Sequence, residues 1–221
     1  MKPAINPTSF PPAETNFLID GPAGHLELLT LAAKESAKGV AILCHPNPLQ
    51  QGTMHNKVVH TLSRAFHQKQ LHTVRFNYRG VGKSEGQFGE SIGEIADLMA
   101  VLAWVDAVCD KPKIWLAGFS FGCFISANGA INHPCEQLYS VAPAVTHQNF
   151  EVLSSISSPW VVIQGEQDEV IPPQDVYQWF DKRAHQQPNM SLYKMPETTH
   201  FFHGKLIELR NLVEKTVVGV G

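Results

Sequence analysis

The stretch KIWLAGFSFG, residues 113–122, decides the fold of this chain. An apolar run typical of a buried strand ends at Ala117, and a run compatible with a helix follows from Cys123 to Ile131. Between them, Ser120 sits in a G-x-S-x-G pattern. Where a strand turns sharply into a helix, the residue at the turn is held in a strained backbone conformation, and only small residues two positions away avoid a clash. The stretch therefore predicts a nucleophile elbow with Ser120 at its tip.

The pattern G-x-S-x-G occurs twice more, around Ser84 and around Ser91. Ser84 lies in a glycine-rich, charged segment with no helix directly behind it. Ser91 follows no strand, but Glu94 stands three residues later and an apolar helical pattern follows, so Ser91 to Glu94 predicts a capping box that opens a helix. Only Ser120 lies between a strand and a helix.

Strand-like and helix-like stretches alternate along the chain, which is typical of an α/β fold with a mainly parallel sheet and helices on both faces. Residues 16–20 and 25–32 flank a Gly-Pro-Ala-Gly turn and are expected to form an antiparallel hairpin at one edge. Further strands are expected at 40–44, 73–77, 113–117, 137–141, 160–164 and 191–194, and helices at 57–68, 95–108, 123–131, 174–184 and 204–218.

The expected carboxyl ends of the strands form one rim, where open sheets of this kind bind ligands. Four positions just after strands carry reactive or unusual residues: the segment His45 to Leu49, and Ser120, Asp168 and His200. A serine hydroxyl needs a base within hydrogen-bond reach, and the base needs a carboxylate to fix its tautomer. The chain order serine, acid, histidine is the order that α/β-hydrolases use.

Each assignment has rivals nearby in the sequence. Glu166 and Glu169 compete with Asp168 for the role of the acid, and His203 competes with His200 for the role of the base. The shorter side chain favours Asp168, and the position after the last strand favours His200. His203 would lie about one turn later if the last helix began early.

With these motifs in place, the chain resembles the α/β-hydrolase superfamily, and more narrowly the small bacterial serine esterases without a cap domain, relatives of the dienelactone-hydrolase type. The resemblance spans nearly the whole chain and rests on residues 118–122, on HPNP at 45–48 with GTMHNK at 52–57, on NYRGVGKS at 77–84, and on Asp168 and His200. Dienelactone hydrolases use a cysteine nucleophile, whereas this chain has serine, so their substrate is not implied.

Acyl transfer also needs donors for the oxyanion. One is expected to be the backbone N–H of Phe121, which directly follows the nucleophile and begins a helix. In the loop after 40–44, Pro46 and Pro48 have no N–H, which leaves Asn47 or Leu49. The resemblance of residues 45–47 to the His-Gly-x pattern of the family favours Asn47.

The substrate pocket is expected to involve His45, Leu49 and Phe201. The segment between the strands at 137–141 and 160–164 is too short for the cap that many hydrolases of this fold insert there. We therefore expect an open, shallow site that takes small esters.

Two other readings of the motifs are disfavoured. Residues 82–84 end like a phosphate-binding loop, but the required first glycine is absent and no helix follows. His55, His60, His67 and His72 are spaced by five and seven residues and lack the H-x-x-x-H spacing of a metal site.

Composition bounds the remaining expectations. The 221 residues, 43% of them hydrophobic, predict one domain over 1–221 with a proline-rich lead at 1–14. The net charge of −3 disfavours nucleic acid or an anionic membrane as main partner. Four cysteines without a C-x-x-C pair, and no signal-peptide pattern, point to the cytoplasm. No metal or organic cofactor is expected; an exposed sheet edge or the terminal helix could support a homodimer.

The sequence thus predicts a carboxylesterase-like serine hydrolase acting on a small-molecule acyl substrate. A thioesterase or a short-peptide hydrolase would use the same atoms and stays open as an alternative. So does a binding module that keeps the fold without turnover.

Overall fold

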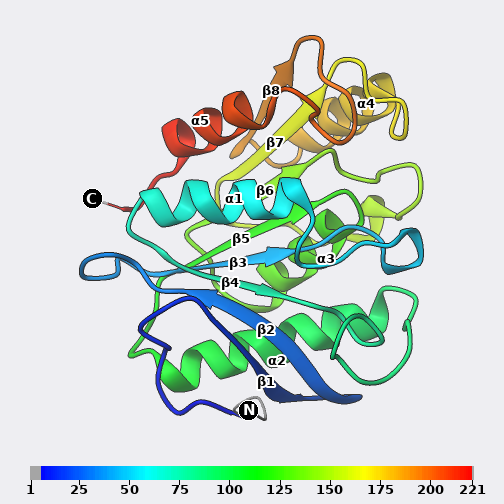
Figure 1. Cartoon of the computed structure of the whole chain (residues 1–221). Coiled ribbons are helices and arrows are strands. Elements are labelled where there is room, and N and C mark those ends of the chain that lie inside the picture. The colour runs from blue at the N-terminus through cyan, green and yellow to red at the C-terminus, as the bar shows by residue number, and fades with distance from the viewer. Residues whose placement is uncertain (1–5, 221) are drawn as a thin grey trace.

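The computed structural model describes residues 6–220 and contains one eight-stranded sheet in the order β1-β2-β4-β3-β5-β6-β7-β8 (Figure 1). The strands are β1 (Thr15–Gly21), β2 (Gly24–Leu31), β3 (Val40–Cys44), β4 (His72–Phe76), β5 (Ile114–Phe119), β6 (Gln137–Val141), β7 (Trp160–Gly165) and β8 (Met190–Met195). The expected hairpin is confirmed: β1 and β2 pair antiparallel at one edge, and β2 also runs antiparallel to β4. The other neighbours are parallel.

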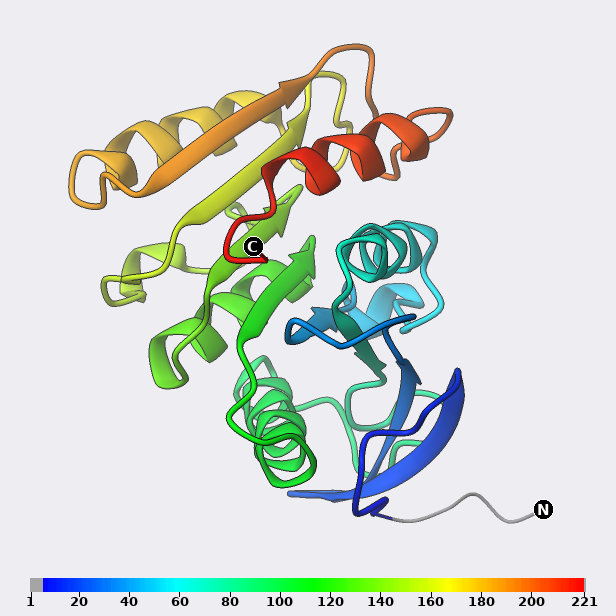
Figure 2. The same ribbon diagram turned by 90° about the vertical axis from the view of Figure 1, so that its left-hand side faces the viewer.

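Helices cover both faces of the sheet, as Figures 1 and 2 show. Five α-helices are described in residues 6–220: α1 (Lys57–Gln68), α2 (Ile92–Val108), α3 (Phe121–Asn132), α4 (Pro173–Ala184) and α5 (Leu206–Thr216). Apolar side chains of α1 and α5 share one buried cluster with Leu43, whereas those of α2, α3 and α4 join the cluster around Ile42. Adjacent residues of β3 thus point to opposite faces, as strand geometry requires.

The central strands are apolar because both of their sides are covered. All five residues of β3 and all six of β5 are buried, and such continuous apolar runs are typical of parallel strands packed between helices. This arrangement sends the polar groups to the strand ends. Figure 1 shows the arrowhead of β3 pointing to the right, towards the loops that carry the chemistry discussed below.

The loop after β4 is organised around a buried carboxylate. Glu27 of β2 is only 5% exposed and accepts hydrogen bonds from Asn77 Nδ2 (2.8 Å) and from the Lys83 N–H (2.9 Å). Ser84 Oγ accepts the Glu27 N–H and donates to the Asn77 carbonyl. Ser84 is therefore a structural serine, and the segment that ends like a phosphate loop folds around the protein's own carboxylate.

An ion pair between Arg79 and a buried aspartate, Asp97, holds the same loop against α2. The Arg79 guanidinium donates to the Asp97 carboxylate, with Nη2 2.8 Å from Oδ1, and the Arg79 N–H donates to Oδ2 at 2.8 Å. The Asp97 side chain is 0% exposed. The capping box predicted at Ser91 is also present, since Glu94 accepts the Ser91 N–H at 2.8 Å. Helix α2 consequently begins at Ile92, three residues before the expected start.

Residues 1–5 of the expected proline-rich lead lie outside the described residues. From residue 6 the lead packs along the molecule: Phe10 stacks on His72 with ring centroids 4.1 Å apart, and the Pro7 carbonyl accepts the Trp104 indole N–H at 3.1 Å.

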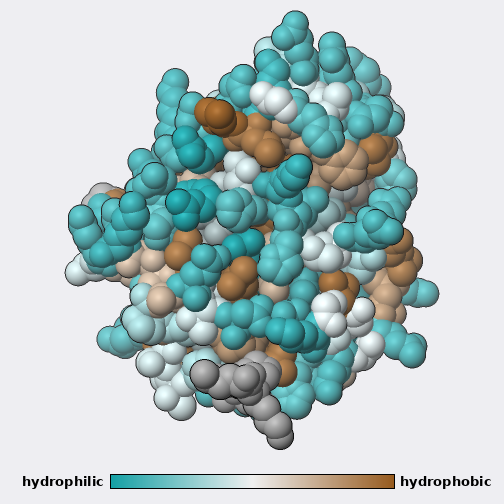
Figure 3. Space-filling model, in the orientation of Figure 1, coloured by the Kyte–Doolittle hydropathy of each residue, from teal (hydrophilic) through white to brown (hydrophobic). Residues whose placement is uncertain are grey.

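Hydrophobic residues on the surface are scattered on the face that Figure 3 draws. On the face drawn in Figure 3, hydrophobic residues form small separate groups between hydrophilic ones. Within residues 6–220 none of the helices combines the length and the apolar character needed to span a bilayer.

Candidate active site

Ser120 stands at the turn between β5 and α3 with the backbone conformation expected for an elbow. Its φ of 53° and ψ of −116° lie in a region that residues with a side chain rarely adopt, and its N–H is tied to the Val141 carbonyl at 2.9 Å. The side chain is recessed, with 8% of the residue exposed. The turn thus places Ser120 directly after the carboxyl end of β5.

The two glycines around Ser120 are required by close backbone approaches. A Cβ on Gly118 would lie 2.2 Å from the Gly122 carbonyl oxygen, and a Cβ on Gly122 would lie 2.3 Å from the Cys44 carbonyl oxygen. Real Cβ atoms do not approach backbone atoms this closely. The two glycines of the G-x-S-x-G pattern are therefore needed because α3 packs closely against the ends of β3 and β5.

A buried carboxylate and an imidazole meet beside Ser120. Asp168 follows β7, His200 follows β8, and Asp168 Oδ2 lies 2.8 Å from His200 Nδ1. Both side chains are at most 3% exposed. With Nδ1–H donating to Asp168, Nε2 carries no proton. Ser120 and His200 line the same small cavity.

The Asp168 carboxylate is satisfied on both oxygens. Oδ1 accepts the N–H groups of Val170 (2.9 Å) and Ile171 (2.7 Å), and Oδ2 also accepts from Gln164 Nε2 at 3.0 Å. Burial raises the pKa of Asp168, but the hydrogen bonds from His200 and from the two backbone N–H groups outweigh burial, so its pKa lies below the ordinary value. Asp168 is thus an anion held in place for His200.

The rivals for these roles are placed elsewhere. Glu169 is exposed, and its carboxylate accepts the backbone N–H of His200 at 3.1 Å instead of contacting the ring. Glu166 is also exposed, and its side chain makes no hydrogen bond to His200 within the described part of the chain. His203 is exposed in the turn before α5, because the chain adopts left-handed conformations at Phe202 and Gly204 and the helix begins only at Leu206. The helix thus begins two residues after the expected residue 204, and His203 lies outside it.

Two cavities meet at Ser120. The larger has a volume of about 470 Å³ and the smaller about 300 Å³. Four residues line both of them: Asn47, Gln50, Ser120 and Val170. Phe121 lines only the larger cavity, and His200 lines only the smaller. In place of the shallow site expected from the sequence, Ser120 therefore lies between two hollows, and no cap domain covers it among residues 6–220.

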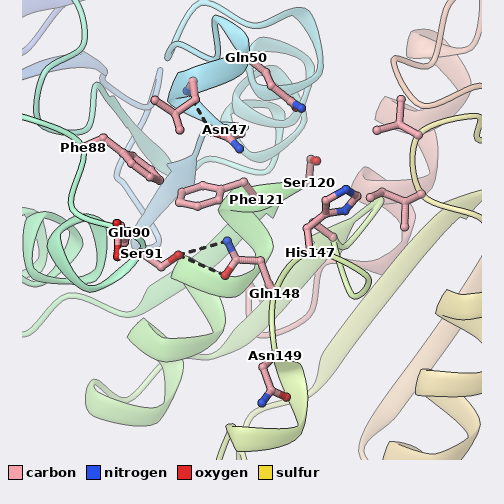
Figure 4. A pocket seen from close by; sticks show the side chains of 14 residues that line it. Asn47, Gln50, Phe88, Glu90, Ser91, Ser120, Phe121, His147, Gln148 and Asn149 are labelled. Carbon is pink, nitrogen blue, oxygen red and sulfur yellow. Dashed lines mark hydrogen bonds between the residues drawn. The ribbon is translucent and has the colours of Figure 1, made fainter.

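Figure 4 shows the larger cavity, with the rings of Phe88 and Phe121 at its side and a polar pair, Ser91 and Gln148, below them. The ring centroids lie 6.0 Å apart. The Ser91 hydroxyl donates to Gln148 Oε1 at 3.2 Å, and Gln148 Nε2 donates to Ser91 Oγ at 3.1 Å. This pair joins the start of α2 to the loop between β6 and β7.

Sequence reasoning missed Phe88, Gln148 and Val170 as lining residues, and it read Ser91 only as a helix cap. The loop at 142–159 occupies the place where a cap domain would be inserted, and it supplies Ala144, His147, Gln148 and Asn149 to the larger cavity. Loop residues have no periodicity, so no pattern in the sequence indicated which of them face the site.

The loop after β3 folds into a short 3-10 turn, Pro48–Gln50, with Asn47 as its cap. The Leu49 N–H donates to Asn47 Oδ1 at 2.9 Å, whereas the Asn47 N–H has no protein acceptor within residues 6–220. The Phe121 N–H, at the first residue of α3, likewise has none among the described residues. Of the two donors considered in this loop, Leu49 is thus already engaged.

Two of the three expected pocket residues line a cavity, and the third does not. Leu49 is 70% exposed and lines the larger cavity, and Phe201 is 42% exposed and lines the smaller. His45 is 0% exposed and lines neither cavity. Its Nδ1–H donates to the Pro46 carbonyl at 2.7 Å, and its Nε2 accepts the Tyr78 N–H at 3.2 Å. Burial lowers the pKa of His45 to about 3, so it is a neutral link between two loops and not a pocket residue.

The histidines considered as metal ligands do not form a cluster with other potential ligands in residues 6–220. His67 Nε2 donates to the Ala32 carbonyl, and His72 Nδ1 accepts the Ala33 N–H, so both ring atoms serve local structure. Among residues 6–220, no three side chains of His, Cys, Asp or Glu come together as potential metal ligands.

The fold and sequence of this chain are similar to those of solved α/β serine hydrolase structures. An α/β serine hydrolase homologue from Coxiella burnetii is 44% identical, with a TM-score of 0.90, and the match covers 95% of this chain and 100% of that one. An α/β serine hydrolase without a lid from Xanthomonas campestris is 39% identical, with a TM-score of 0.89, and the match covers 97% and 96% of the two chains.

A curated relative, an uncharacterized protein from Rickettsia prowazekii, is 28% identical over 210 residues, which are 91% of this chain and 87% of that protein. No protein-family profile matches the sequence.

Proposed function

Because the chain belongs to the lid-free α/β serine hydrolases, we propose that it hydrolyses small carboxylic esters with Ser120 as nucleophile, His200 as base and Asp168 as the group that orients the base. The observation that carries this proposal is the buried contact of 2.8 Å between Asp168 and His200, beside a serine held at a strained elbow. The three groups come from loops after β7, β8 and β5.

The proposed reaction has two halves. Ser120 Oγ attacks the acyl carbon while His200 Nε2 takes its proton, and a tetrahedral oxyanion forms. The C–O bond to the alcohol then breaks, and His200 returns the proton to the departing alcohol. In the second half, water attacks the acyl-enzyme with His200 again as base, and the carboxylic acid is released with Ser120 restored. Asp168 stabilises the imidazolium in both halves.

Two backbone groups are suited to hold the oxyanion. The Phe121 N–H begins α3, where the helix dipole favours negative charge, and the Asn47 N–H belongs to a loop that lines both cavities. Neither has a protein acceptor within the described residues. Leu49 is excluded by its bond to Asn47 Oδ1.

The lining of the site favours esters of small molecules over coenzyme A thioesters. Neither cavity is lined by a lysine or an arginine among the described residues, so no cation is placed to pair with a pyrophosphate. The volumes of about 470 and 300 Å³ suit short acyl groups. We further place the reaction in the cytoplasm, where the four cysteines, all free thiols, would stay reduced.

A fluorophosphonate probe, mapped by peptide mass spectrometry, tests the nucleophile. We expect labelling at Ser120 that is lost in Ser120→Ala and kept in Ser155→Ala, a matched change at an exposed serine that lines neither cavity. Acetyl and butyryl esters should then be hydrolysed faster than long-chain triglycerides. Folded wild-type protein that resists the probe would instead favour a binding module without turnover.

A further inference from the structure

The two cavities at Ser120 differ in which catalytic group they contain. His200 and Phe201 line only the smaller cavity, together with residues of the loop after β3. Phe121, with the proposed oxyanion donor, lines only the larger one, together with Phe88 and the loop at 142–159. Ser120 is common to both. A substrate bound across Ser120 therefore extends one half into each cavity.

Proton transfer decides which half goes where, and this step rests on the function proposed above. The departing alcohol oxygen must lie within hydrogen-bond reach of the protonated base. Since His200 faces only the smaller cavity, the alcohol half of the ester belongs there, and the acyl half belongs in the larger cavity between Phe88 and Ile171.

The smaller cavity is lined with carboxamides and has no formal charge. Asn47, Gln50, Gln51 and Asn56 all line it, and no lysine, arginine, aspartate or glutamate does so among the described residues. A carboxamide both donates and accepts, as a hydroxyl does, so several of them together match a molecule with several hydroxyls. A phosphate, carboxylate or quaternary ammonium group would find no counter-charge here.

Two of these carboxamides are already fixed in place. Asn47 Oδ1 accepts the Leu49 N–H, and Asn56 Oδ1 accepts the Val58 N–H, each at 2.9 Å. These bonds use the oxygens and leave the Nδ2 groups as donors without a partner in residues 6–220. Gln50 and Gln51 are exposed, and their side chains make no hydrogen bond to the described residues. The cavity thus has fixed donors and adaptable amides.

An aromatic ring completes the wall of this cavity. Phe201 is 42% exposed and is held edge-on against the rings of Phe119 and His200, at centroid distances of 6.2 and 5.1 Å. A ring held in this way offers a rigid apolar surface to the C–H groups of a bound polyol. Amides and an aromatic surface together suit a molecule with both hydroxyls and C–H faces.

From this arrangement we propose that the smaller cavity binds the alcohol half of the substrate, and that this alcohol is an uncharged polyol such as glycerol or a sugar. Its hydroxyls bond to the carboxamides of Asn47, Gln50, Gln51 and Asn56, and its carbon skeleton packs on Phe201. The structure thereby assigns a leaving-group class to the proposed esterase.

The test compares four butyrate esters that differ only in the alcohol, namely ethyl butyrate, glyceryl monobutyrate, a methyl glucoside butyrate and butyrylcholine, with the thioester butyryl-coenzyme A. Acid release is followed for each, or free thiol for the last. We expect kcat/KM for the glyceryl and glucoside esters to exceed that for ethyl butyrate by about tenfold, the worth of one to two hydrogen bonds to the substrate.

Two variants connect this preference to the cavity. Gln51→Met, which keeps an unbranched side chain of similar length, and Phe201→Leu should each lower the ratio of glyceryl to ethyl ester by about threefold or more. Gln186→Met is the matched control, since Gln186 is exposed after α4 and lines neither cavity, and it should keep the wild-type ratio. Fluorophosphonate labelling of Ser120 verifies that each variant is folded.

The possible failures can be told apart. Equal kcat/KM for ethyl and glyceryl esters, or a preference for the choline or coenzyme A ester, overturns the polyol assignment while ester hydrolysis stands. A polyol preference that survives both variants overturns the assignment to this cavity. No hydrolysis of any ester, together with no labelling of Ser120, refutes the proposed function and the inference with it.

Discussion

Asp168 Oδ2 lies 2.8 Å from His200 Nδ1, while the neighbouring Glu169 reaches the backbone N–H of the same histidine at 3.1 Å. Two adjacent carboxylates therefore hold His200 at two different points. Only the first can set the tautomer of the ring, because only the first contacts a ring nitrogen.

This difference predicts a graded response to removal of each acid. Asp168→Asn should lower kcat/KM for a butyrate ester by about 10³- to 10⁴-fold, because the amide no longer stabilises the imidazolium. Glu169→Ala should cost less, about threefold to tenfold, through a looser His200 backbone. Glu166→Gln is the control and should stay near wild type. If Glu169→Ala lowers kcat/KM as much as Asp168→Asn does, the assignment of the acid role to Asp168 is wrong.

The side chain of Asn47 caps the turn Pro48–Gln50 by accepting the Leu49 N–H. We therefore expect this side chain to position the backbone N–H of Asn47, the proposed oxyanion donor. Asn47→Ala removes the acceptor of the Leu49 N–H, so the turn Pro48–Gln50 loosens and kcat should fall about tenfold as the oxyanion donor is displaced. Asn47→Ser retains a capping oxygen and should lose less. If the serine and alanine variants are equally impaired, the cap does not position the donor.

The elbow predicts a large difference between two glycine substitutions. In Gly122→Ala the new Cβ would lie 2.3 Å from the Cys44 carbonyl oxygen, so unfolding in urea should show a loss of about 3 kcal/mol or more. Gly204 has a φ of +74° but no atom within 4 Å of such a Cβ, so Gly204→Ala should cost only about 1 kcal/mol of backbone strain. A loss of only about 1 kcal/mol in Gly122→Ala as well would mean that the approach of the Cys44 carbonyl does not require glycine at position 122.

The buried His45 predicts a contribution to acid sensitivity. Its pKa is lowered from 6.5 to about 3, so between these values the unfolded chain binds one proton more than the folded chain. Stability from this group is therefore present above pH 6.5 and is lost as the pH falls below it. From pH 7 to pH 5 the loss is about 2 kcal/mol.

The measurement is the free energy of unfolding at pH 7 and pH 5 for wild type and His45→Gln. The variant should be less stable at pH 7, yet its stability should fall about 2 kcal/mol less between the two values. His203→Gln, at an exposed histidine, is the matched control. An unchanged difference in His45→Gln would show that protonation of His45 is not resisted by the fold.

Phe88 lines the larger cavity. If the acyl half of the substrate binds in this cavity, we expect Phe88 to limit the length of the acyl chain. Phe88→Ala removes a ring beside Phe121 and should raise the ratio of kcat/KM for hexanoyl over butyryl esters by about tenfold. The ratio of glyceryl to ethyl butyrate, measured on the same variant, should not change. A change in the alcohol ratio alone would mean that the two halves are assigned to the wrong cavities.

Much of the fold could be predicted from the sequence, because buried parallel strands and amphipathic helices leave strong patterns. The strands at 40–44 and 137–141 and the helix at 57–68 have the predicted bounds. Ends governed by turns were less predictable. The last helix begins late because left-handed residues at 202 and 204 redirect the chain.

The candidate site could be predicted only where position along the chain decides it. Ser120, Asp168 and His200 each follow a strand, and strand order brings them to one rim. The direction of a loop side chain has no such signature. His45 follows a strand as Asn47 does, yet its ring turns inward to join two loops. Gln148 lines the larger cavity and pairs there with Ser91, which is 57 residues away in the sequence.

The loop at 142–159 has a consequence for how such proteins diversify. It supplies four lining residues to one cavity, but it contributes none of Ser120, Asp168 or His200, and it is anchored at both ends by central strands β6 and β7. Changes of length or composition within it can therefore alter the lining of the larger cavity while Ser120, Asp168 and His200 keep their spacing. A lineage could in this way explore new substrates through insertions and deletions in a single surface segment.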